Sequence, residues 1–255
     1  MNILAKLNTT ARNVIRATGS HISRSRDPAR AFRSDHYLRH NARRLEHLAS
    51  LRIPVAGMSV LDVGAGIGDH SNYYLDRGCK VTITDARAAN LSYLGHRYPD
   101  CSIQFLDMEA PSHIEGSPFD VVHCYGLLYH LNRPEQALAF LSQSTKRMLF
   151  LETCVSFGED EQTNLTAESR SHPTQAFSGT GCRPTRAWVF RELQGLFEYV
   201  YLPTTQPCHE EFPLDWTDPG KHGAGLQRAI FIASRERLEN ETLTASFLLK
   251  QKRQD

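Results

Sequence analysis

The sequence lacks the long apolar runs, paired cysteines and leader-like start that mark membrane and secreted proteins. No stretch of its 255 residues approaches the roughly 18 consecutive apolar residues of a membrane span, and no apolar core with a small-residue cleavage site stands at its start. The six cysteines stand singly, without a CxxC pair, as is typical of free thiols in a reducing compartment. We therefore expect a cytoplasmic, globular protein of one domain with attachments and no membrane span.

The glycine-rich segment 60-VLDVGAGIGDH-70 also lacks what a phosphate-binding turn needs. A dinucleotide-binding turn reads GxGxxG, but position 69 is Asp69, and the Lys that a Walker loop places before Ser or Thr is missing. No Lys or Arg occurs from Val55 to Ser71. We therefore expect a ligand other than a phosphate, which argues against a nicotinamide dehydrogenase.

Charge is unevenly distributed although the net charge is only +1. Residues 1–52 contain eleven Lys or Arg against three acidic residues, a balance of +8, and the remaining residues carry 18 basic against 25 acidic side chains, a balance of −7. A basic arm of this kind can contact nucleic acid or an anionic membrane surface, or it can be a solvated helical extension. We favour the extension because the basic residues are spread out and hardly interleaved with aromatic residues.

Strand-like and helix-like segments alternate up to residue 154. Tyr37, Leu38, Leu45 and Leu48 recur at helical spacing and predict a helix over 34–51. Strands are expected at 59–64, 80–86, 102–108, 119–126 and 147–154, and helices at 69–76, 88–98 and 134–145. This order predicts an α/β fold, a doubly wound and mostly parallel sheet covered by helices on both faces, with an N-terminal helical extension.

The pattern changes in the second part of the chain. Residues 155–184 are polar, contain three glycines and two prolines, and show no clear period, so we expect a lid or substrate-binding insertion. A helix at 184–196 and an antiparallel pair of strands at 197–203 and 228–234 should complete the sheet edge. The resulting divisions are a basic N-terminal extension (1–33), a main domain (34–236) and a charged C-terminal tail (237–255).

Acidic residues close the first three predicted strands. Asp85 ends the second strand, 17 residues after Gly68, and is suited to grip the two hydroxyls of a ribose. Asp107 would lie beside an adenine amine, while Asp62 and Asp69 would face a cation. A nucleoside with an ammonium and a sulfonium group, which is S-adenosylmethionine, meets all four demands. Each acid taken alone could instead be a turn-stabilising or strand-capping residue.

Four segments together resemble the motifs of class I S-adenosylmethionine-dependent methyltransferases, over about residues 43–234. They are 60-VLDVGAGIGDH-70, 83-ITDAR-87, 105-FLDME-109 and 119-FDVVHCYGLLYHL-131. The resemblance implies a seven-stranded sheet of order 3-2-1-4-5-7-6 with the last-numbered strand antiparallel, S-adenosylmethionine as cofactor, and a family with many different acceptors. It implies cofactor contacts from Asp62, Gly64, Ala65, Gly66, Gly68, Asp85, Ala86, Asp107, Met108 and Tyr125.

Methyl transfer to a hydroxyl or amine needs a base, and His130 is the best-placed candidate because its segment follows the fourth strand. It could instead cap a helix or pack against the cofactor. Tyr125 and Tyr129 could shape the pocket or be core aromatics, and His172 and 209-HEE-211 could face the acceptor. We expect no metal site, since only 209-HEE-211 hints at one.

Three functions remain open for such a chain. The first is a methyltransferase acting on a small-molecule, glycan or lipid-linked hydroxyl, with residues 155–184 as the lid. The second is a tRNA-modifying enzyme of the same fold, in which the basic arm holds phosphates, since 183-RPTRAW-188 is similar to transferases that modify the wobble uridine. The third is a non-catalytic cofactor-binding protein. The first is favoured because the body is acidic and the glycine turn is intact. The sequence carries no signal for an oligomeric state.

Overall fold

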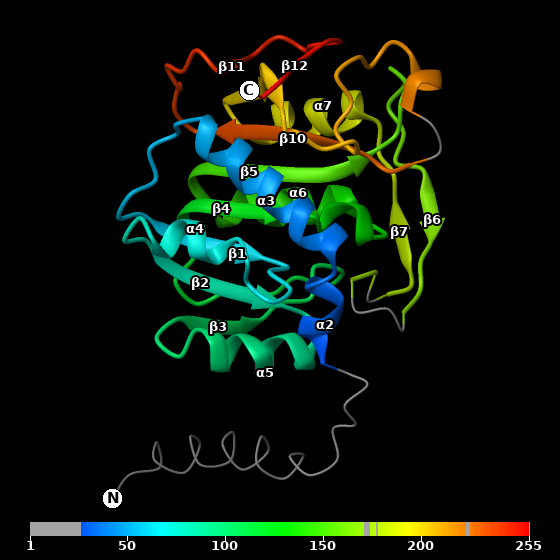
Figure 1. Cartoon of the computed structure of the whole chain (residues 1–255). Helices are drawn as coiled ribbons and strands as arrows, with labels where there is room; N and C mark the ends of the chain where they lie inside the picture. Colours follow the sequence, from blue (N-terminus) through cyan, green and yellow to red (C-terminus); the bar gives the residue numbers. More distant parts are fainter. Residues whose placement is uncertain (1–26, 171–173, 177, 223–224, 255) are drawn as a thin grey trace, which may run out of the picture.

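The computed structural model describes residues 27–170, 174–176, 178–222 and 225–254. They form a mixed sheet of eight strands in the order β11-β8-β10-β5-β4-β1-β2-β3, flanked by helices (Figure 1). The strands of this sheet are β1 (Ser59–Val63), β2 (Lys80–Asp85), β3 (Ser102–Phe105), β4 (Phe119–Tyr125), β5 (Thr145–Val155), β8 (Tyr199–Pro203), β10 (Gln227–Ser234) and β11 (Leu243–Thr244). Most of the predicted basic arm, residues 1–26, lies outside the described residues.

The helices begin and end close to the positions that the sequence predicts, except α2, which was not predicted. Their bounds are α2 (Pro28–Phe32), α3 (Asp35–Ser50), α4 (Ser71–Leu75), α5 (Ala88–Arg97), α6 (Pro134–Ser144) and α7 (Arg186–Leu196), with 3₁₀ turns η2 (Leu128–His130) and η3 (Pro219–His222). Ser34 caps α3 by accepting a hydrogen bond from the Tyr37 amide, and Thr185 caps α7 in the same way through Trp188. Every helix in the described ranges is too short or too polar to cross a bilayer.

The order of the sheet confirms the predicted doubly wound topology and corrects its strand count. Seven strands follow the order 3-2-1-4-5-7-6, and β10 runs antiparallel to both neighbours, β5 and β8. The eighth strand, β11, pairs with Pro203 and Leu202 at the edge beyond β8. Because β11 has only two residues, it carries no alternating pattern from which it could have been predicted.

Two hydrophobic cores lie on opposite faces of the sheet because successive strand residues point to opposite sides. Leu61 and Leu149 belong to the core that α6 and α7 cover, whereas their neighbours Val60 and Phe150 belong to the core beneath α3, α4 and α5. Phe150, Val60 and Leu61 are fully buried. Coverage of both faces explains why these strands are almost continuously apolar.

The segment that follows β10 is held against the body rather than extending as a free charged tail. Besides β11, it forms β12 (Lys252–Arg253), which pairs in parallel with β9 (Thr205–Gln206). The Gln251 side chain accepts a hydrogen bond from the indole of Trp216 at 2.9 Å and donates one to the Pro203 carbonyl at 2.7 Å. Backbone and side-chain amide groups make these contacts, so the charge pattern of this segment does not predict them.

The segment 155–184, predicted as an insertion, lies at the carboxyl ends of the parallel strands. Part of it is regular: β6 (Leu165–Ala167) and β7 (Thr180–Cys182) pair antiparallel. In Figure 1 the arrowheads of β2 and β5 point toward the side where this hairpin and α2 lie, while α3 crosses in front of the sheet. The insertion and the N-terminal helices therefore flank the sheet edge at which ligands bind in this topology.

Candidate active site

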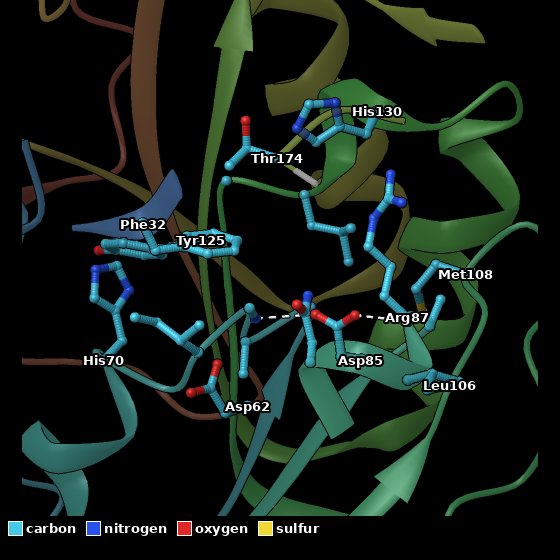
Figure 2. Close-up of a pocket in the computed structure, with 18 of the residues that line it drawn as sticks. Phe32, Asp62, His70, Asp85, Arg87, Leu106, Met108, Tyr125, His130 and Thr174 are labelled. Carbon is cyan, nitrogen blue, oxygen red and sulfur yellow. Dashed lines mark hydrogen bonds between the residues drawn. The ribbon is translucent and has the colours of Figure 1, made fainter. Parts of the chain in front are cut away.

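A cavity opens at the carboxyl ends of β1, β2 and β4, and α2, α3 and the insertion contribute to its walls (Figure 2). His130 and all the predicted cofactor contacts line it except Gly68. Phe32 of α2, three residues of α3 and Thr174 of the insertion line it as well. Segments that lie far apart in the chain thus meet around one cavity.

The glycine turn after β1 adopts a backbone conformation that other residues rarely adopt. Gly64 and Gly66 have φ angles of 68° and 61°, in the left-handed region that favours glycine. A Cβ atom on Gly66 would lie 2.9 Å from the Phe32 ring, so this ring packs directly on the turn. Phe32 lies within the predicted extension 1–33, which the sequence alone treats as peripheral.

Gly68 differs from the prediction made for it. It does not line the cavity, and a Cβ atom there would lie 2.5 Å from the ring of Tyr98 and 2.8 Å from Leu94. The Tyr98 hydroxyl also donates a hydrogen bond to the Gly68 carbonyl at 2.6 Å. Close packing of the turn against α5 is therefore a reason for glycine at position 68 that does not involve a ligand.

Asp85 connects the end of β2 to the glycine turn. Its Oδ2 accepts a hydrogen bond from the Gly66 amide at 2.9 Å, and its Oδ1 accepts one from the Arg87 amide at 2.8 Å (Figure 2). Burial raises the pKa of this carboxyl above its usual value, although the bonds from Arg87, Asn90 and Gly66 oppose the shift. Each oxygen keeps acceptor capacity for a further donor.

Asp62 lies at the base of the cavity and is almost completely buried. The Ser71 hydroxyl donates a hydrogen bond to its Oδ2 at 2.6 Å. Burial raises the pKa of Asp62 to about 7, and the nearby charge of Asp85 adds to the shift. A cation placed beside Asp62 would favour its ionised form. Asp69, the second acid expected to face a cation, already forms an ion pair with Arg97 at 2.6 Å.

Several buried polar atoms around the cavity lack a partner. Arg44 Nε, His70 Nε2, Asn90 Oδ1 and the Tyr125 hydroxyl make no hydrogen bond within the described part of the chain, and all four residues line the cavity. Buried polar groups are nearly always hydrogen-bonded in native proteins, so a concentration of exceptions marks a place where a ligand supplies the partners. Arg44 was missed from the sequence because helical spacing alone does not reveal which polar residue of α3 points inward.

His130 is held by a carboxylate from the insertion. Its Nδ1 lies 2.5 Å from Oε2 of Glu168, whose other oxygen pairs with Arg183 at 3.2 Å. Burial lowers the pKa of His130 below its usual value, and the bond to Glu168 offsets this only in part. The ring is therefore neutral at neutral pH, with Nδ1–H donating to Glu168 and Nε2 left as a proton acceptor. The sequence did not indicate Glu168, since it lies 38 residues from its partner.

Of the remaining candidates, only Tyr125 lies at the cavity within the described residues. Tyr125 lines the cavity, whereas Tyr129 packs beneath Arg183 and Arg228 and does not. The segment 209–211 does not line the cavity and packs against α3. His172 lies outside the described residues.

The fold and the cavity are those of an α/β protein with a ligand site at the carboxyl ends of its parallel strands. Comparison with known proteins agrees: residues 60–148 match the family described as methyltransferase domain. In this segment, which is about a third of the chain, the protein is similar to the class I S-adenosylmethionine-dependent methyltransferases, a family whose cofactor is S-adenosylmethionine.

Two relatives in sequence cover part of the chain. One is a ubiquinone biosynthesis O-methyltransferase from Albidiferax ferrireducens, 36% identical over 108 residues, covering 40% of this chain and 42% of the relative. The other is a tRNA U34 carboxymethyltransferase from Pseudoalteromonas translucida, 31% identical over 123 residues, covering 46% and 38%. The chain thus matches less than half the length of each relative.

Solved structures share the fold at low sequence identity. The N-terminal domain of EvdMO1, solved in the presence of S-adenosylhomocysteine and D-fucose, has a TM-score of 0.60 at 18% identity and covers 79% of this chain and 84% of its own. A methyltransferase from Mesorhizobium loti has a TM-score of 0.55 at 14% identity and covers 77% and 100%. At these identities the likeness concerns the fold.

Proposed function

We propose that the chain binds S-adenosylmethionine in this cavity and transfers its methyl group to a hydroxyl of a small-molecule, glycan or lipid-linked acceptor. The observation that supports an acceptor that must lose a proton, such as a hydroxyl, is His130 held by Glu168 at the cavity wall. An acceptor that must lose a proton needs such a base, whereas a thioether or an already nucleophilic carbon does not. The name of the O-methyltransferase relative agrees with this assignment.

The cofactor assignment follows from the charges and the unpartnered atoms. Asp85 would accept hydrogen bonds from the ribose hydroxyls, and Asp107, with Met108 beside it, would border the adenine. Asp62 would stabilise the ammonium group. The unpartnered Nε of the buried Arg44 suits the cofactor carboxylate, because charge-assisted hydrogen bonds from guanidinium groups are strong.

Each residue has a defined part in the transfer. The bound cofactor supplies an electrophilic methyl group on a sulfonium. His130 would accept, at Nε2, the proton that the acceptor hydroxyl loses on methylation. Glu168 is a positioning residue that keeps the proton on Nδ1 and favours the imidazolium that results. Phe32 and the insertion would cover the cavity and exclude water.

The acceptor class can be tested with cofactor carrying a deuterated methyl group. We expect label to appear in the small-molecule or glycan fraction of a cell extract. The His130→Ala protein should label this fraction about 10²–10⁴-fold more slowly, which is the usual contribution of a general base. Its affinity for S-adenosylhomocysteine should stay unchanged, which shows that the cavity is intact. Full labelling by His130→Ala would assign the base elsewhere.

A tRNA substrate is the second candidate, favoured by the tRNA U34 carboxymethyltransferase relative and by the basic balance of residues 1–52. Total tRNA added to the same assay distinguishes the two. If label enters tRNA, and the affinity for tRNA falls steeply as the salt concentration rises, then tRNA and not a small molecule is the acceptor.

A further inference from the structure

A second group of ligating side chains lies between α3 and the turn that follows β9. His36 and His40 stand one helical turn apart on α3, and His209, Glu210 and Glu211 come from the turn. His36 Nε2 lies 3.6 Å from Glu211 Oε1, and His40 Nε2 lies 3.7 Å from Glu211 Oε2. We call these five residues the His–Glu cluster.

The expectation of no metal site was based on 209-HEE-211 alone and did not consider the histidines of α3. The segment 36-HYLRH-40 has the HxxxH spacing that places two imidazoles on one face of a helix. The segment 209-HEE-211 was noticed, but the two segments are about 170 residues apart, and only the fold brings them together.

Two imidazoles of the cluster are buried with a nitrogen unused. His40 and His209 are 3% and 2% exposed, and Nε2 of each makes no hydrogen bond within the described part of the chain. Neither residue lines the cofactor cavity, so the proposed cofactor offers them no partner. Unpartnered buried nitrogens beside a carboxylate are what a metal site without its ion presents. In His209 the other nitrogen, Nδ1, accepts a hydrogen bond from the Glu211 amide at 3.2 Å, and metal binding through Nε2 would replace this bond by moving the ring proton to Nδ1.

The spacing of the donor atoms suits a small transition-metal ion. Ligand atoms of His40, His209 and Glu211 all lie within 4.8 Å of one another, as do those of His36, His209 and Glu210. Tetrahedral zinc with bonds of about 2.0–2.1 Å needs ligand atoms about 3.4 Å apart, so small adjustments close the group of His40, His209 and Glu211 around an ion. His36, which is exposed and grouped with His209 and Glu210, must move toward them to become the fourth ligand. Imidazole-rich sites select zinc-type ions over magnesium and calcium, which prefer all-oxygen sites.

The charges around the cluster are balanced. Arg228 donates to Oε2 of Glu211 at 2.5 Å, and Arg39 pairs with Glu210. The Arg228 contact leaves Oε1 of Glu211 as the free ligand atom and holds the carboxylate in orientation, as outer partners of metal ligands do. The same Arg228 pairs with Glu152, and Glu152 pairs with Arg44 in the cofactor cavity.

We propose that His40, His209 and Glu211, completed by His36, bind one zinc-type ion that fastens α3 to the turn after β9. The ion would be structural, since the cluster lies outside the cavity. Because α3 also carries Tyr37, Asn41 and Arg44 into the cavity wall, the ion would fix the wall through the helix. This proposal does not depend on the acceptor or on the transfer reaction.

The test uses the full chain without a histidine tag, freed of metal by a chelator. After zinc addition and dialysis, elemental analysis should find one zinc ion per chain, and the melting temperature should rise by about 5 °C or more at zinc concentrations far above the dissociation constant. Magnesium should do neither. His40→Ala should weaken zinc affinity by roughly 100-fold or more, since even outer-partner changes cost 10–100-fold.

Two further variants keep the result interpretable. His36→Ala removes an exposed ligand and should weaken zinc binding without harming the fold, while His113→Ala, an exposed histidine outside the cluster, should bind zinc as the unchanged protein does. Circular dichroism and S-adenosylhomocysteine affinity report on folding. The proposal fails if the unchanged protein retains no stoichiometric zinc, or if folded His40→Ala and His36→Ala proteins retain as much zinc as His113→Ala.

Discussion

Replacing Asp85 by alanine separates its two roles, which are to grip the ribose and to hold the glycine turn. A carboxylate that accepts two hydroxyl hydrogen bonds contributes about 1.5–3 kcal/mol for each, so the loss should total about 3–6 kcal/mol. Since about 1.4 kcal/mol corresponds to a factor of ten, the affinity for S-adenosylhomocysteine should fall by about 100-fold or more.

The same substitution should also destabilise the protein. It leaves the amides of Gly66 and Arg87 without their side-chain acceptor, and unsatisfied buried donors cost about 1–3 kcal/mol each. Chemical denaturation without ligand measures this loss of folding free energy. Asp100→Ala, which removes an exposed acid near β3, should change neither quantity.

A ligand without ribose hydroxyls isolates the direct contact from the effect on the turn. Calorimetry with S-adenosylhomocysteine and its 2′,3′-dideoxy analogue should show a large preference for the hydroxylated ligand in the unchanged protein and a small one in Asp85→Ala. Equal preference in both proteins would refute the ribose contact, even if Asp85→Ala binds weakly.

Three further predictions concern other residues of the site. Cofactor binding near pH 7 should release a proton from Asp62, whose pKa of about 7 falls when a cation lies beside it; calorimetry in buffers of different ionisation enthalpy measures this, and Asp62→Asn should abolish it. Gly68→Ala should lower the free energy of unfolding by roughly 2–5 kcal/mol, because φ is 80° there and the Cβ would meet Tyr98; unchanged stability in a denaturant titration would contradict this packing. Glu168→Gln should slow turnover and move the acidic limb of the rate profile to lower pH, because the carboxylate raises the pKa of His130. If the acidic limb of the pH–rate profile does not shift, Glu168 is not a positioning residue for His130.

The sign of the Asp62 effect on stability follows from the same pKa. Its folded pKa lies above the unfolded value, so the native state binds a proton that the unfolded chain has released between these two values. The contribution of Asp62 to stability is therefore greatest at acidic pH and declines as pH rises through about 7. Cofactor binding should reverse this decline by placing a cation beside the carboxylate.

The sheet and the strand-end acids could be predicted because their causes are local. Apolar runs bounded by glycines specify strands, and parallel strands end at one edge, so Asp62, Asp85 and Asp107 had to converge. The positions of these acids could be predicted without knowledge of the contacts between distant segments.

The parts that were missed depend on contacts between distant segments. Phe32 and Arg44 reach the cavity, and Glu168 reaches His130, only because the N-terminal helices and the insertion dock on the sheet edge. Nothing in the spacing around Glu168 indicates that it meets His130. The packing of Gly68 against Tyr98 and Leu94 could not be predicted either, since close packing and ligand approach both require glycine.

The central claim is that the cavity accepts a nucleoside with a cationic sulfur and not an anionic diphosphate. Calorimetry of one sample with S-adenosylmethionine, S-adenosylhomocysteine and NAD tests this claim most directly. The account predicts binding of the first two ligands, with loss of affinity in Asp85→Ala, and no heat of binding with NAD. Tight binding of NAD with no response to either S-adenosyl compound would contradict it.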